Sequence, residues 1–102
     1  MYVNIFQSRR RIDIDGDAYA VDAEWIAVLA REQKGFVFYR SYRSQDGEAV
    51  SISGWESEAD ARAWARHPDH AAVQARGQAD YYDSYTNFSC ADVEIRRFER
   101  KA

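Results

Sequence analysis

The residues that could perform chemistry are concentrated between Trp55 and Tyr85. This segment contains both histidines, the only proline, two of the three tryptophans and three of the seven tyrosines. An imidazole titrates near neutral pH and can remove the proton of a phenol or an enol. Indole and phenol rings can cover a planar ligand. The segment therefore predicts one wall of a pocket, with an acid–base group in it.

His70 and Trp64 are the candidates for a catalytic role. His70 shares a helical face with Val73, Gln74 and Gly77, which follow it by three, four and seven residues. It is either a base in a pocket or a structural residue bonded to a backbone carbonyl, and both interpretations stay open. For Trp64, a position in the core and a position in the pocket wall are likewise both open.

A broken helix is expected to position these side chains. Ser57 begins a capping-box pattern that ends at Asp60, which is typical of a helix N-terminus. Pro68 disfavours helical geometry at His67 but suits the first turn of a new helix. The sequence therefore predicts a helix, a break at His67 and Pro68, and a second helix that runs towards Tyr81. His67 is expected to end the first helix with an exposed ring, with a ligand contact as the alternative.

Hydrophobic periodicity defines the remaining elements. The expected strands cover residues 1–10, 36–44, 49–55 and 84–100, and a helix capped by Asp17 covers 17–33. The last strand is expected to be irregular near Ala91 and Asp92. This β-α-β-β-α-β order, in a single domain of residues 1–102, is the ferredoxin-like α+β arrangement. In that arrangement an antiparallel sheet carries both helices on one face.

The opposite face of the sheet must also be covered, because its strands carry many apolar and aromatic residues. A second copy of the chain is the expected cover, so the sequence predicts a homodimer formed through this sheet face. Arg40 interrupts one of these apolar strands. A buried guanidinium needs a partner, which is expected to be Glu56, with an anionic ligand as the alternative.

Composition argues against several functional classes. A net charge of −3 disfavours nucleic acid as the partner, and the Arg9–Arg11 run is expected to be a solvated strand end. No apolar run is long enough to span a bilayer. The single Cys90 fits a reducing cytoplasm. The Asp13–Asp17 segment lacks the acid spacing of a calcium loop, so no metal site is expected.

Several short motifs occur together in a characteristic order. They are Gln33-Lys34-Gly35-Phe36, Asp46-Gly47, Ser53-Gly54-Trp55-Glu56-Ser57-Glu58, Trp64, His67, His70, Ala72-Val73-Gln74 with Gly77, and Tyr82 with Tyr85. Together they resemble the antibiotic biosynthesis monooxygenase domain family, which consists of small dimeric α+β barrel proteins. The resemblance extends from Tyr19 to Arg100 and implies the same ferredoxin-like fold.

Two branches of that family imply different chemistry for this chain. In one branch, enzymes oxidise aromatic polyketides with molecular oxygen and without metal or flavin, and Trp64 matches a tryptophan that helps to form their pocket. In the other, proteins bind and degrade haem, and their axial histidine falls on Gln74 here. A neutral amide is a poor iron ligand. A strand-one asparagine of the haem branch corresponds to Asn4.

These observations give one main functional hypothesis and two alternatives. The main one is a cofactor-independent, monooxygenase-like enzyme for a hydrophobic aromatic substrate of the polyketide or quinol type, with His70 as the base and Trp64 in the pocket wall. The expected substrate contacts are Asn4, Arg40, Trp55, His67, Gln74 and Tyr82. The alternatives are a haem or small-molecule binding protein without turnover, and a non-catalytic dimeric accessory or stress protein without a pocket.

Overall fold

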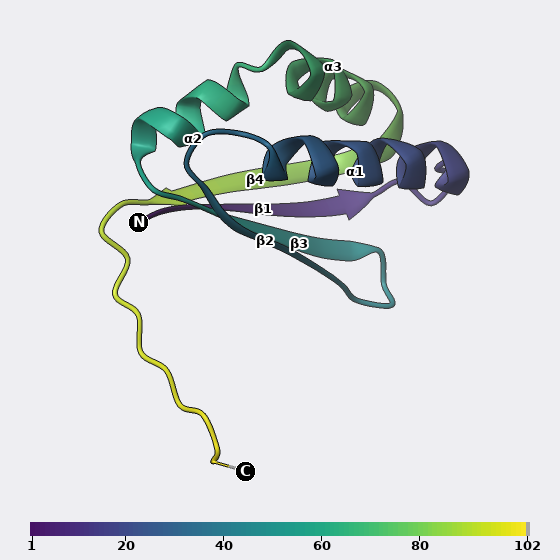
Figure 1. Ribbon diagram of the computed structural model, residues 1–102. Helices are drawn as coiled ribbons and strands as arrows, with labels where there is room; N and C mark the ends of the chain where they lie inside the picture. The colour runs from purple at the N-terminus through teal and green to yellow at the C-terminus, as the bar shows by residue number, and fades with distance from the viewer. Residues whose placement is uncertain (102) are drawn as a thin grey trace.

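A computed structural model describes residues 1–101, and it has one layer of helices packed on one face of a four-stranded sheet (Figure 1). The elements in chain order are β1 (Tyr2–Arg10), α1 (Gly16–Arg31), β2 (Phe36–Arg43), β3 (Glu48–Trp55), α2 (Glu58–Ala65), α3 (Pro68–Arg76), a π-helical turn (Gly77–Tyr81) and β4 (Tyr82–Cys90). No helix in the described part of the chain is long and apolar enough to cross a membrane.

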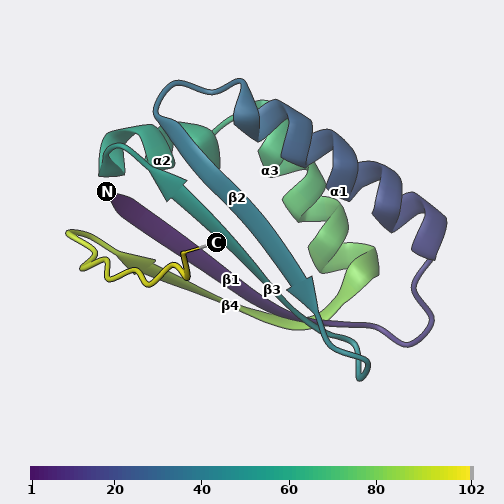
Figure 2. The same ribbon diagram turned by 60° about the horizontal axis from the view of Figure 1, so that its bottom comes forward.

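The sheet has the strand order β2-β3-β1-β4, and each neighbouring pair is antiparallel. The predicted ferredoxin-like α+β fold is therefore confirmed. Figure 2 shows α1 and α3 lying side by side across the strands, with α2 at the end where β3 finishes. Because side chains alternate along a strand, each strand presents one set of residues to the helices and the other set to the open face.

The predicted helix break is confirmed, but the prediction of an exposed His67 ring is wrong, since His67 is half-buried and its ring lies 5.7 Å from that of Trp64. Ser57 caps α2 by accepting a hydrogen bond from the backbone N–H of Asp60. α2 ends at Ala65, and Pro68 opens α3 at a position where its missing N–H costs nothing. His67 caps α3, because its Nδ1 accepts a hydrogen bond from the Asp69 N–H at 3.2 Å. The histidine before the proline thus has a structural role as a helix cap.

Three predicted boundaries, at the two ends of α1 and at the end of the last strand, are wrong. The cap of α1 is Asp15 and not Asp17, since the Asp15 carboxylate accepts from the N–H groups of Asp17 and Ala18, and α1 ends at Arg31. The last strand stops at Cys90 and does not continue to residue 100. Asp92 has a φ of 52°, a left-handed conformation that turns the chain out of the strand direction. Residues 91–101 then run out on the side of the sheet away from the helices (Figure 1).

The core is small and lies at one end of the space between the sheet and the helices. Trp55 is 1% exposed and packs with Ala30, Ala61 and Trp64. The Phe36 ring meets the Trp55 indole edge-on at 5.8 Å, and the two indoles stack at 6.2 Å. Burying aromatic area of this size dominates the packing energy of a short chain. Away from these tryptophans, side chains do not fill the space between the layers.

The arginine run at the end of β1 is only partly the solvated strand end that the sequence predicted. Arg9 pairs with Asp46 and Glu48, and Arg11 pairs with Asp13, all near the surface. Arg10 differs, because it lies on the same side of the sheet as Phe6, is half-buried and has its guanidinium 5.4 Å from the Tyr19 ring of α1.

Replacing Gly35 by alanine is expected to destabilise the fold by about 1–3 kcal/mol. Gly35 has a φ of +79°, and an added Cβ would lie 2.6 Å from the Asp60 Cβ, where the loop after α1 meets α2. Urea unfolding would measure the change. Gly16→Ala is the matched control, because nothing lies within 4 Å of its Cβ position. Equal effects of the two substitutions would contradict this account of Gly35.

Candidate functional site

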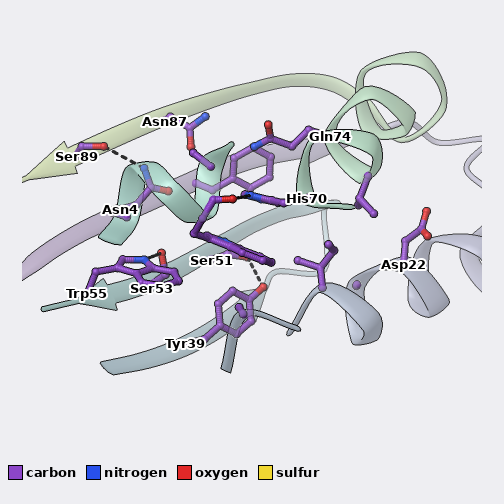
Figure 3. Close-up of a pocket in the computed structure, with 18 of the residues that line it drawn as sticks. Asn4, Asp22, Tyr39, Ser51, Ser53, Trp55, His70, Gln74, Asn87 and Ser89 are labelled. Carbon is purple, nitrogen blue, oxygen red and sulfur yellow. Dashed lines mark hydrogen bonds between the residues drawn. The ribbon is translucent and has the colours of Figure 1, made fainter. Parts of the chain in front are cut away.

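A cavity of about 370 Å³ lies between the sheet and the helices (Figure 3). This volume falls in the range of small-molecule sites. The alternative of a protein without a pocket is therefore wrong. The lining consists of Tyr2, Asn4, Phe6, Tyr19, Asp22, Ala23, Ile26, Ala30, Tyr39, Ser51, Ser53, Trp55, Ala61, Arg62, Trp64, Ala65, His70, Val73, Gln74, Tyr81, Tyr82, Asn87 and Ser89.

An indole–imidazole stack forms one part of the cavity wall. The His70 ring lies 4.3 Å from the Trp64 ring, with only 10° between their planes. Trp64 in turn stacks on Trp55. The histidine is therefore held by a continuous run of aromatic rings that reaches into the core, and its orientation does not depend on a mobile loop.

The helix break determines which nitrogen of His70 carries the proton. In a continuous helix the carbonyl of Trp64 would accept the N–H of residue 68, but Pro68 has none. That carbonyl instead accepts the His67 N–H at 3.0 Å and lies 3.1 Å from Nδ1 of His70. A carbonyl only accepts, so Nδ1 must be the donor and a neutral ring has its lone pair on Nε2. Nε2 has no partner among the described residues.

The His70 imidazole is a weaker base than a free histidine. Burial lowers its pKa from the ordinary value of 6.5, the hydrogen bond to the Trp64 carbonyl opposes this effect, and the neighbouring His67 adds slightly to the lowering. The ring is therefore neutral at pH 7. A neutral imidazole with an open Nε2 can accept a proton from a ligand.

The sheet side of the cavity is polar. The Asn4 amide donates to Ser89 Oγ at 3.0 Å, and the Tyr39 hydroxyl donates to Ser51 Oγ at 3.3 Å (Figure 3). Ser53 accepts the indole N–H of Trp55 at 3.1 Å. These side chains share one face of neighbouring strands, so they form a row of hydrogen-bonding groups opposite the aromatic wall.

An ion pair closes the wall between α1 and α3. Arg76 donates two hydrogen bonds to Asp22, at 2.8 and 2.9 Å, and the Tyr81 hydroxyl donates a third at 2.7 Å. These bonds, with the Arg76 bond foremost, lower the pKa of the Asp22 carboxyl. Asp22 is therefore an ionised and fully partnered group that ties two helices together, and it is not a free acid in the cavity.

The cavity lining includes most of the residues that the sequence predicted for the site. Six of the eight predicted site residues line the cavity, namely Asn4, Trp55, Trp64, His70, Gln74 and Tyr82. Arg40 and His67 do not. Arg40 is exposed, because it alternates with Tyr39 and faces the open side of the sheet, and its guanidinium donates to its neighbour's carbonyl and not to Glu56. His67 is occupied with capping α3.

The lining residues that the sequence did not predict include a group of small polar ones. Ser51, Ser53, Asn87 and Ser89 line the cavity, together with the phenol of Tyr39. Their signal in the sequence was the placement of serine and asparagine at alternate positions of predicted strands. A strand that buries this face in a dry core would carry apolar residues there.

Residues 1–101 hold no group of three histidine, cysteine or acidic side chains that could bind a metal ion. Gln74, which the resemblance to the haem branch matches with that branch's axial histidine, lines the cavity. Its amide does not fit ferric or ferrous iron, so a haem in this cavity would depend on Nε2 of His70.

The fold and the site together define a class: a ferredoxin-like α+β domain with a ligand-sized pocket between its helices and its sheet. The family model described as "Antibiotic biosynthesis monooxygenase" matches residues 15–76. The uncharacterized protein YqjZ of Bacillus subtilis (strain 168) is 33% identical over 84 residues, which cover 82% of this chain and 72% of that protein. The chain belongs to the antibiotic biosynthesis monooxygenase family.

Solved structures support the fold assignment. Rv0793 from Mycobacterium tuberculosis superposes with a TM-score of 0.81 at 16% identity, covering 94% of this chain and 98% of that one. SnoaB from Streptomyces nogalater, a cofactor-independent oxygenase, has a TM-score of 0.76 at 14% identity, covering 92% and 94%. At these identities the likeness establishes the fold alone.

The protonation state of His70 can be tested by NMR. We expect the imidazole nitrogen shifts to show a proton on Nδ1 and none on Nε2 at pH 7, and the ring to titrate below 6.5, because burial disfavours the charged form. His67→Asn assigns the second histidine while keeping a side-chain cap on α3. As the pH falls below 6.5, the unfolded chain gains a proton first, so this group's contribution to stability is lost on the acid side. A proton on Nε2 at pH 7 would refute the assignment.

Proposed function

We propose that the protein is a cofactor-independent, monooxygenase-like enzyme that oxidises a hydrophobic aromatic substrate carrying an acidic phenol, enol or activated methylene group. The observation that supports this most is the open Nε2 of a neutral His70, stacked on Trp64 in a ligand-sized cavity. A base of this kind can remove a proton from such a substrate. A cavity with a large aromatic surface suits the body of the same ligand.

The proposed reaction needs little from the protein. His70 Nε2 takes the proton, and the resulting carbanion or phenolate donates electrons to molecular oxygen. For an anthrone, the methylene carbon keeps one oxygen atom as a carbonyl, and its two hydrogens leave with the other oxygen atom as water. A dry, preorganised site favours this step, because water would stabilise the substrate anion and slow its oxidation.

The polar row on the sheet side gives the substrate an orientation. Asn4 and Tyr39 on the strands, with Gln74 facing them from α3, offer hydrogen-bonding groups to hydroxyl or keto substituents of a flat ligand. Trp55 supports Trp64 from behind, so it acts on the ligand through the stack. Membership of the family supports this function, and so does the fold shared with SnoaB, which is itself a cofactor-independent oxygenase.

A homodimer through the open sheet face is part of the proposal. Val3, Ile5, Ile52, Phe38 and Phe88 alternate with the pocket residues and so share this face. Phe88 is 47% exposed in the single chain. A contiguous apolar face of this kind is typical of a protein interface, and a second copy would cover it.

The dimer predicts a sedimentation experiment. The wild-type chain, of 11.8 kDa, is expected to sediment with twice that mass. Phe88→Glu is expected to weaken the dimer at least tenfold, because it would bury an unpaired charge between the sheets. Val28→Glu, on α1 where Val28 is 48% exposed, is the control and should leave the mass unchanged. A monomeric wild-type protein would rule out the interface.

The catalytic proposal predicts oxygen consumption with anthrone or quinol substrates. His70→Gln is expected to reduce kcat by about 10²–10⁴-fold, the usual contribution of a general base. Activity should be constant above pH 6.5 and fall on the acid side, because the base works only when neutral and its pKa lies below 6.5. His67→Asn serves as the control and should keep wild-type kcat. If no substrate of this class consumes oxygen, the proposed reaction is wrong.

Haem titration distinguishes the proposed oxygenase from a haem-binding protein. An open Nε2 is also the form of histidine that binds iron, so a Soret shift that disappears in His70→Gln would favour haem binding. Under the oxygenase proposal, added haem produces no shift that depends on His70. The two experiments together decide between turnover and haem binding.

A further inference from the structure

Two arginines converge on one tyrosine at the far end of the pocket. Arg10 and Arg43 both lie on the helix side of the sheet, with their guanidinium carbons 5.4 and 5.9 Å from the centroid of the Tyr19 ring. These distances keep the two positive charges within about 11 Å of each other. Tyr19 itself lines the cavity.

Apart from the Tyr19 ring, both charges lack a partner in the described part of the chain. Neither guanidinium has an ion pair in residues 1–101, whereas Arg76 and Arg62, on the pocket walls or beside them, each have one. The Nε atom of Arg10 is buried and has no hydrogen-bond partner among the described residues. A partly buried charge without a partner is costly. The cost falls if an anion occupies the space next to the guanidinium.

Phenolic donors meet the arginines at this end. Tyr19, Tyr39 and Tyr82 all line the cavity. Burial, followed by the neighbouring Tyr19 and Tyr39 phenols, raises the pKa of Tyr82, while the Arg10 guanidinium opposes the rise. The Tyr82 hydroxyl is therefore protonated at neutral pH and can donate. Hydroxyl donors beside unpaired guanidinium groups are the groups that bind a carboxylate.

We propose that the Tyr19 end of the pocket, with Arg10 and Arg43, binds a carboxylate substituent of the aromatic ligand. The inference rests on the proposed function, because it places the ring system of the same ligand at His70 and Trp64. The π-helical turn that covers Tyr82 begins at Gly77, seven residues after His70, which is about 10 Å along the helix axis. A fused-ring ligand with a carboxylate at one end can reach both groups.

Charge elsewhere in the cavity agrees with this orientation. Asp22 is neutralised by Arg76, Arg62 is paired with Glu58, and His70 carries no charge at pH 7. Arg10 and Arg43 lie next to Tyr19 but are not themselves in the pocket lining, and among the described residues they are the unpaired positive charges beside an otherwise neutral pocket. A carboxylate at the opposite end would lie against the indole rings without a cation.

The test compares anthraquinone-2-carboxylate with its methyl ester. Quenching of tryptophan fluorescence would give the Kd of each ligand, and we expect the wild-type protein to bind the carboxylate about tenfold more tightly than the ester. Arg10→Gln and Arg43→Gln should each remove most of this preference and leave ester binding unchanged. Arg43 is exposed, so its substitution is expected to be tolerated by the fold even if that of Arg10 is not. Added salt should weaken binding of the carboxylate only.

Arg31→Gln is the matched control, since Arg31 is exposed at the other end of α1 and, unlike Arg10 and Arg43, has no contact with the ring of Tyr19. The inference is overturned if the wild type binds the two ligands equally, if the arginine variants weaken both equally, or if neither ligand binds at millimolar concentration. The carboxylate preference without oxygen consumption would keep this site and reject the proposed reaction. Oxygen consumption without the carboxylate preference would support the proposed reaction and reject this site.

Discussion

A single missing hydrogen-bond donor determines the arrangement of the pocket. Pro68 cannot offer an N–H to the carbonyl of Trp64, and its ring disfavours helical geometry at the residue before it. The helix therefore breaks, and the carbonyl accepts Nδ1–H of His70 instead. One peptide group thus positions the imidazole, fixes its tautomer and brings it parallel to the indole of the same residue. The chemistry available in the cavity follows from a backbone constraint.

The sheet supports this arrangement through the alternation of its strands. Asn4 and Ser53 pair across β1 and β3 and face the cavity, while Val3 and Gly54, one residue earlier and later, face the open side. A slip of one residue in the register would exchange the polar row for the apolar face. The pocket and the proposed dimer surface are therefore formed by alternating residues of the same strands, and a change of register would alter both.

Much of the fold could be predicted because its signals are local. The N-cap at Ser57, the break at His67 and Pro68 and the order of the elements each depend on a few adjacent residues. Alternation could not say which face of a strand meets the helices, and for that reason Arg40 was expected in the pocket and the serines were missed. The change of alternation after Cys90 did predict an irregularity at Ala91 and Asp92, but it could not show that the strand ends there and does not resume after a bulge.

The distribution of charge links the two ends of the cavity. In a low-dielectric site, deprotonation of a neutral ligand by His70 creates an imidazolium and an anion side by side, and their attraction offsets part of the cost of separating charge. The arginines near Tyr19 add a positive potential from the opposite end of the ligand. A carboxylate bound there would neutralise that potential and leave the reacting group to the imidazolium alone. A ligand without a carboxylate would instead have the anion formed at its reacting group stabilised by both the imidazolium and the arginines. A ligand with a carboxylate should therefore bind more tightly in this pocket, and its reacting group should be less acidic there.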